Sequence, residues 1–129
     1  MMTPSQTVMR GWQLLQAGQL AAADEMVRPL LAPMNDELVP LVGAIRLQQS
    51  RFSEAAPLFE RARALNPREV RFAFLHGTAL AGMNRFAEAV PAFQAAIKLA
   101  PNIADPYLAL GQAQRKLRQL DEAQDTYRK

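Results

Sequence analysis

The sequence predicts an all-α solenoid, a stack of antiparallel helix pairs. Two observations predict it. Glycine recurs at a step of 34 residues, at positions 43, 77 and 111 (77 − 43 and 111 − 77), and the segment RFSEAAPLFERARALNP is followed one period later by RFAEAVPAFQAAIKLAP. Within each period, apolar residues follow helical spacing in two stretches that are separated by a short turn. A single helix pair cannot bury its apolar face, so such units have to stack.

Each period repeats the same small and aromatic residues. Gly43, Gly77 and Gly111 are predicted to lie in the middle of a first helix, where glycine costs about 1 kcal/mol relative to alanine. We expect that a second helix backbone passes too closely for a larger side chain, which would offset this cost. The residues expected to allow this approach, or to fill the space between one pair and the next, are Ala55, Ala89, Ala123, Phe59, Phe93 and Tyr127.

The turns and helix starts carry signals of their own. Turns are expected after Ser50, Asn84 and Arg118, which are again 34 residues apart (84 − 50 and 118 − 84). Beyond the first of these turns, Ser53 is expected to cap the second helix while Glu54 complements the helix dipole. The helices are therefore predicted to reverse direction at three equivalent places.

Asp105 and Pro106 are expected to open a later helix as its cap and its first residue, since proline is favoured at that position.

The first unit departs from the period. Gly11 precedes Gly43 by only 32 residues (43 − 11), and Pro29 and Pro33 fall where its second helix should finish. Proline inside a helix costs about 3 kcal/mol. The helix is therefore expected to kink or end near Arg28.

These signals divide one solenoid domain into four units. They are a degenerate, cap-like first unit at 4–35, two regular units at 36–69 and 70–103, and an incomplete fourth unit at 104–129. No polar capping helix follows the last unit, although solenoids need one for solubility. We therefore expect the chain to be an excised module that continues beyond residue 129, with a short terminal tail as the alternative.

The composition argues against catalysis. The chain contains no cysteine and one histidine, so thiol chemistry and a multi-histidine metal site are not expected. No glycine-rich phosphate loop, nucleophile elbow or HExxH motif is present. His76 is expected to be a partly buried structural residue of a first helix. We therefore expect no enzyme activity, no cofactor and no metal.

Hydropathy and charge limit location and partners. No apolar run reaches the roughly 18 residues of a membrane helix, and the N-terminus lacks the features of a signal peptide, which predicts a cytoplasmic protein without membrane contact. The net charge of +3 is small and no basic face emerges, so nucleic-acid binding is not expected. The basic stretch at 115–118 is interpreted as a solvated helix end, with a phosphate-binding patch as the alternative.

This pattern resembles the tetratricopeptide repeat (TPR) family over nearly the whole chain. The small residue, aromatics, alanines and closing proline of that family are matched in one unit by Gly77, Phe86, Ala89, Phe93, Ala96 and Pro101. The resemblance implies a right-handed superhelix of about 3.5 repeats and roughly 7–8 helices, whose first helices line a concave groove. Two devices of the family are missing here. They are a lysine/asparagine/arginine clamp for a peptide carboxylate and an asparagine ladder, whose positions hold Leu41, Leu75 and Ala109.

The resemblance also implies a ligand groove with an apolar strip and polar edges. Helical projection places the following residues in it: Trp12, Pro40, Ala44, Gln48, Arg71, Phe74, Thr78, Leu108, Gln112 and Arg115. Trp12 either points into the groove, where it would be a binding hot spot, or packs against the N-terminal residues of its own unit.

Three functions of different classes fit these expectations. The first is a protein-interaction scaffold that binds a peptide or a partner helix in the groove. The second is the N-terminal substrate-recruiting module of a larger enzyme, such as a sulfotransferase, glycosyltransferase or hydroxylase. The third is self-association, a homo-oligomer formed through apolar surface exposed by the unfinished last unit. The sequence does not identify the protein or peptide partner.

Overall fold

The computed structural model describes residues 3–31 and 35–128, with side chains as far as Asp121 except that of Pro4. The α-helices are α1 (Pro4–Gln16), α2 (Leu20–Val27), α3 (Val39–Gln48), α4 (Phe52–Leu65), α5 (Val70–Gly82), α6 (Phe86–Leu99) and α7 (Ala104–Arg128). A 3-10 turn, η1 (Arg28–Leu30), follows α2. No strand occurs within the described ranges, and no helix there is long and apolar enough to cross a membrane.

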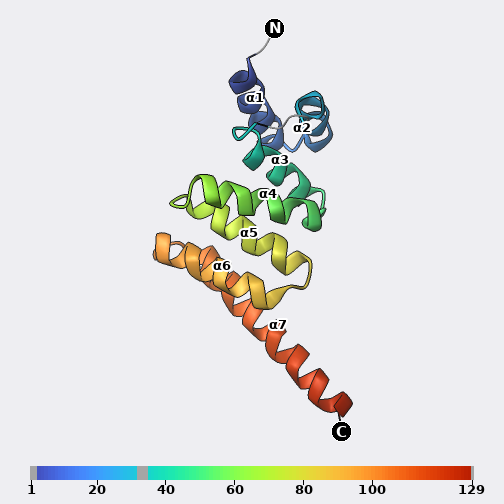
Figure 1. The fold of residues 1–129 in the computed structure, drawn as a ribbon, viewed down its shortest axis with the longest axis vertical. Helices are drawn as coiled ribbons and strands as arrows, with labels where there is room; N and C mark the ends of the chain where they lie inside the picture. The colour runs from blue at the N-terminus through green and yellow to red at the C-terminus, as the bar shows by residue number, and fades with distance from the viewer. Residues whose placement is uncertain (1–2, 32–34, 129) are drawn as a thin grey trace.

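Helix pairs stack along the long axis of the molecule (Figure 1). The helices α1 and α2, α3 and α4, and α5 and α6 form the pairs, each helix packs against the next, and α7 packs against α6. The core lies between these layers, where Phe59, Phe93, Leu41 and Ile45 are almost completely buried. The predicted all-α solenoid is confirmed.

A glycine in the first helix of a pair makes room for a phenylalanine of the second helix. A Cβ atom added at Gly77 would lie 2.7 Å from Cε1 of Phe93, and one added at Gly43 would lie 3.1 Å from Cζ of Phe59. Both rings are buried. The expectation of a helix backbone above these glycines is therefore wrong, because the close neighbour is an aromatic ring of the same pair.

Gly111 has no such neighbour. A Cβ atom added there would meet nothing within 4 Å, and the residue is exposed. By the step of sixteen residues that separates the other two glycines from their rings (59 − 43 and 93 − 77), its partner would be Tyr127. The expectations for Tyr127 and Ala123 fall outside the described side chains.

The three turns inside the pairs share one backbone conformation. Gly18, Ser50 and Asn84 have φ angles of 79°, 60° and 61°, in the left-handed region. At each turn the next backbone N–H donates to the carbonyl oxygen five residues earlier, over 2.8–2.9 Å. This pattern satisfies the last carbonyls of the first helix and redirects the chain. The predicted turns after Ser50 and Asn84 are confirmed.

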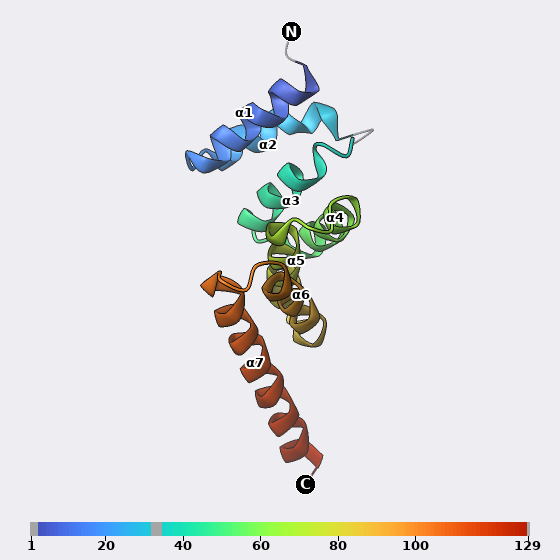
Figure 2. The same ribbon diagram turned by 90° about the vertical axis from the view of Figure 1, so that its left-hand side faces the viewer.

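The predicted turn after Arg118 is wrong. α7 continues through this position as a helix of 25 residues. Its C-terminal part runs on beyond α6 with no other described helix beside it (Figures 1 and 2). Arg118 takes the place in the period that serine and asparagine hold at the other turns. Left-handed backbone costs about 1–2 kcal/mol for most residues, and arginine is a strong helix former. The last unit therefore contains one long helix and no pair.

The first unit ends as its prolines predict. α2 stops directly before Arg28, and Pro29 lies in η1, whereas Pro33 lies outside the described residues. The predicted break near Arg28 is confirmed. A buried ion pair connects this unit with the next one, because Arg46 Nη1 donates to Asp24 Oδ1 at 2.8 Å and Arg28 Nη2 donates to Oδ2 at 3.0 Å.

Two predicted helix caps are wrong. Ser53 lies inside α4, whose N-cap residue is Arg51, and no side chain caps that end. Glu54 does lie in the first turn, where its charge complements the dipole. α7 begins at Ala104, so Asp105 lies within the first turn and does not precede it.

Candidate partner-binding groove

The first helices of successive units form one continuous face. α1 contacts α3, α3 contacts α5, and α5 contacts α7. Side chains from neighbouring helices leave three cavities along this row. We name them the N-terminal, middle and C-terminal groove cavities.

The N-terminal groove cavity lies among α1, α3 and α5 and has a volume of about 240 Å³. It is lined by Trp12, Leu15, Gln16, Ala44, Leu47, Gln48, Arg71 and Leu75. Trp12, whose direction the sequence left open, is half-buried against the core and lines this cavity. The exposed amides of Gln16 and Gln48 give the cavity a polar edge.

The middle groove cavity lies between α5 and the start of α7 and has a volume of about 130 Å³. It is lined by Val70, Arg71, Phe74, Ile103, Asp105 and Pro106. Arg71 lines both this cavity and the N-terminal one, and its Nε donates to Glu69 Oε1 at 3.3 Å. Arg71 therefore stands at the junction of the two cavities.

The C-terminal groove cavity is the largest of the three, with a volume of about 470 Å³. It is lined by Phe74, Thr78, Ala81, Phe86, Phe93, Ala109, Gln112, Ala113, Arg115 and Lys116. The ring centroids of Phe74 and Phe93 are 5.9 Å apart, with the planes tilted by 49°. Arg115 and Lys116 are exposed at the edge, and no acidic residue lines the cavity.

The structure brings most of the predicted groove residues into these cavities. Pro40 and Leu108 are the exceptions, since neither lines a groove cavity and Leu108 is 65% exposed. Whether the other predicted residues contact a partner stays a prediction.

Sequence reasoning missed Phe86, Phe93 and Lys116 as cavity residues, because only first helices were projected and the basic stretch was interpreted as solvated. The sixteen-residue step from Gly77 to Phe93 is the signal that could have placed this ring behind α5.

A different cavity, of about 520 Å³, lies among α4, α5 and α6. It is lined in part by His76, Glu60 and Glu88. His76 is half-buried, and Arg63 Nη1 lies 3.1 Å from its Nδ1. Burial lowers the pKa of His76, and the nearby charge of Arg63 lowers it further. Within the described part of the chain, no group of three or more histidine, cysteine or carboxylate side chains is placed to hold a metal ion.

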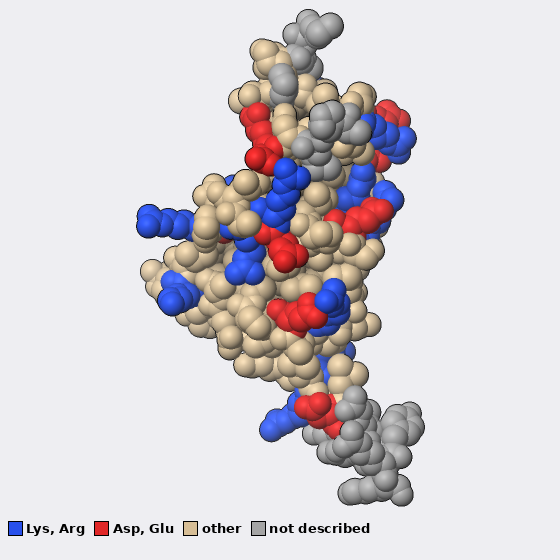
Figure 3. Space-filling model, in the orientation of Figure 1, with Lys and Arg blue, Asp and Glu red and all other residues tan. Residues whose placement is uncertain are grey.

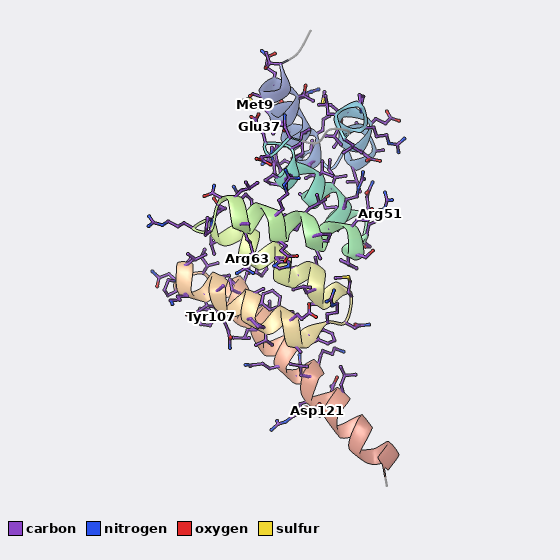
Figure 4. All side chains as sticks on the ribbon, in the orientation of Figure 1. Met9, Glu37, Arg51, Arg63, Tyr107 and Asp121 are labelled. Atoms are coloured by element: carbon purple, nitrogen blue, oxygen red, sulfur yellow. The ribbon has the colours of Figure 1, made fainter. Side chains whose placement is uncertain are left out.

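Most other charged side chains lie in mixed pairs. Figure 3 shows basic and acidic side chains close together over the middle of the stack. Arg51 with Glu54 and Arg85 with Glu88 form ion pairs at 2.7 Å. Near the start of α7, Tyr107 is labelled in Figure 4, and its hydroxyl donates to the carbonyl oxygen of Pro101 at 2.9 Å.

Comparison with known proteins agrees with this geometry. The tetratricopeptide repeat family matches residues 43–102 and 74–129. Similar solved structures include MamA of AMB-1 (TM-score 0.79, 24% identity, covering 95% of this chain and 73% of that chain) and MamA from Desulfovibrio magneticus RS-1 (0.73, 22%, 96% and 77%). The first TPR domain of human RPAP3 is also similar (0.77, 19%, 90% and 93%). At such identities the likeness shows the fold alone. No curated protein matches the sequence.

Proposed function

This chain belongs to the tetratricopeptide repeat family, and we propose that it is a protein-interaction scaffold whose groove holds a peptide or a helix of a partner protein. The observation that carries the proposal is the row of three cavities along α1, α3, α5 and α7. Apolar walls supply burial, while the amides and cations at the edges can orient a bound chain. A cytoplasmic location is part of the same proposal.

Peptides selected by display on the immobilised chain test this function. We expect the selected peptides to lose binding to Phe74→Asp, which puts a charge in two cavities, and to Gln112→Trp, which fills one of them. Leu65→Asp is the control, because Leu65 is 50% exposed on α4 and lines none of the groove cavities. Helical circular dichroism should be the same for all variants. Equal binding to both groove variants would remove the groove from consideration.

Self-association through the C-terminal unit is a second candidate. It is favoured by the exposed apolar side chains of α7, Tyr107, Leu108 and Leu120, and by the open surface at Gly111. Light scattering over a concentration series should then show a dimer that dissociates on dilution, and a monomer at every concentration would contradict it. A recruiting module of a larger enzyme would use the same groove, and the downstream reading frame distinguishes that role.

A further inference from the structure

We propose that the C-terminal groove cavity takes an acidic peptide segment of the partner, in which one bulky apolar side chain lies within a few residues of aspartate or glutamate. This inference rests on the proposed function of the groove and names the chemistry of its ligand. The apolar side chain enters the cavity, and the carboxylates lie against the cations at its edge.

The floor of the cavity accounts for the apolar anchor. Phe93 and Ala113 are each 2% exposed, so the floor is rigid and already desolvated. Phe74 and Phe86 are only half-buried, so each keeps ring surface that a ligand can cover. Burying apolar area releases about 25 cal/mol per Å², and aromatic pairs prefer the tilted contacts that Phe74 and Phe93 already make. A leucine or an aromatic side chain is therefore the fitting occupant.

The edge of the cavity accounts for the carboxylates. Arg115 and Lys116 are adjacent in α7, so their side chains leave the helix about 100° apart and border the cavity from different sides. Gln112 lies one turn before them, where it can reach either neighbour. Neither cation forms an ion pair with a described carboxylate. Both charges are therefore available to a ligand.

The contrast with the other cavities makes the chemistry specific to this one. Glu60 and Glu88 line the cavity among α4, α5 and α6, and Asp105 lines the middle groove cavity. A carboxylate would be repelled in those places, whereas the C-terminal groove cavity has only positive charge at its edge. An acidic ligand is thereby directed to one end of the groove.

Calorimetric titration with three synthetic peptides tests the proposal. The first is an acidic hexapeptide with one central phenylalanine, the second has lysine in place of the acidic residues, and the third has glycine in place of phenylalanine. We expect only the first to bind well, with an affinity that falls as salt rises. The double variant Arg115→Glu and Lys116→Glu should weaken it about tenfold. The matched control is Arg68→Glu with Lys98→Glu, which changes the net charge equally at exposed sites lining none of the groove cavities and should leave binding unchanged.

Two results would overturn the inference. One is equal binding of the acidic and lysine peptides, and the other is an affinity for the acidic peptide that survives charge reversal at Arg115 and Lys116. If display selects neutral or basic peptides that Gln112→Trp still abolishes, this inference fails while the groove function stands. If no selected peptide depends on the groove at all, both fail.

Discussion

Replacing Gly77 by alanine should lower the free energy of unfolding by about 1–2 kcal/mol, although alanine is the better helix former. The new Cβ atom would lie 2.7 Å from Cε1 and 2.8 Å from Cδ1 of Phe93. Carbon atoms prefer roughly 3.5–4.0 Å, so the ring would have to retreat by about 1 Å. Phe93 is buried and packs on Phe74, so it has no room to do so. Overpacking costs about 1–3 kcal/mol, and the gain in helix propensity of about 1 kcal/mol offsets only part of it.

Gly43→Ala and Gly111→Ala are the matched controls, since all three glycines occupy the same place in the period. At Gly43 the nearest ring atom of Phe59 is 3.1 Å away, so we expect a smaller loss. At Gly111 nothing lies within 4 Å, so alanine should raise the stability by up to about 1 kcal/mol. Urea and thermal unfolding followed by circular dichroism measure the series, in which Gly77→Ala should lower Tm by roughly 5 °C. The reasoning fails if Gly77→Ala is as stable as Gly111→Ala.

Three further predictions follow from the turns and the titrating groups. Arg118→Gly should allow the missing turn, so X-ray scattering should give a shorter maximum dimension than for the unmodified chain; an unchanged dimension would show that this residue does not keep α7 straight. Burial alone raises the pKa of Asp24, but hydrogen bonds from Arg46 and Arg28 hold it below its ordinary value. The stability contributed by Asp24 is therefore present above that ordinary pKa and is lost as the pH falls through the lower folded value, and Asp24→Asn should lower stability at pH 7 and flatten the acid limb of the stability curve. Burial, followed by the charge of Arg63, lowers the pKa of His76, so protonation opposes folding below the ordinary value of 6.5; His76→Gln should remove the loss of stability between about pH 6.5 and pH 5, and an unaltered profile would contradict this.

Local features of the chain predicted most of the helices. The turns after Ser50 and Asn84 and the break at Pro29 depend on backbone preferences of a few residues, which are visible in the sequence. The burial of Phe59 and Phe93 followed from the period for the same reason. A repeating unit makes the same contacts each time it recurs, so a pattern seen twice determines both copies.

The same reasoning failed at the end of the stack. Gly111 continues the period, yet it has no ring above it, because Arg118 does not turn the chain and α7 stays straight. A periodic sequence predicts equivalent surroundings, whereas the surroundings depend on whether a neighbouring helix is present. One residue without a left-handed preference was enough to remove that neighbour.

The sequence by itself determined that helix pairs stack into a solenoid, because hydrophobic spacing and turn residues act over short distances along the chain. Only the tertiary structure decided which side chains share a cavity. Phe74, Phe93 and Lys116 come from three helices, and their meeting depends on how α5, α6 and α7 are rotated and spaced. Packing of whole helices sets those rotations, and no short stretch of sequence encodes them.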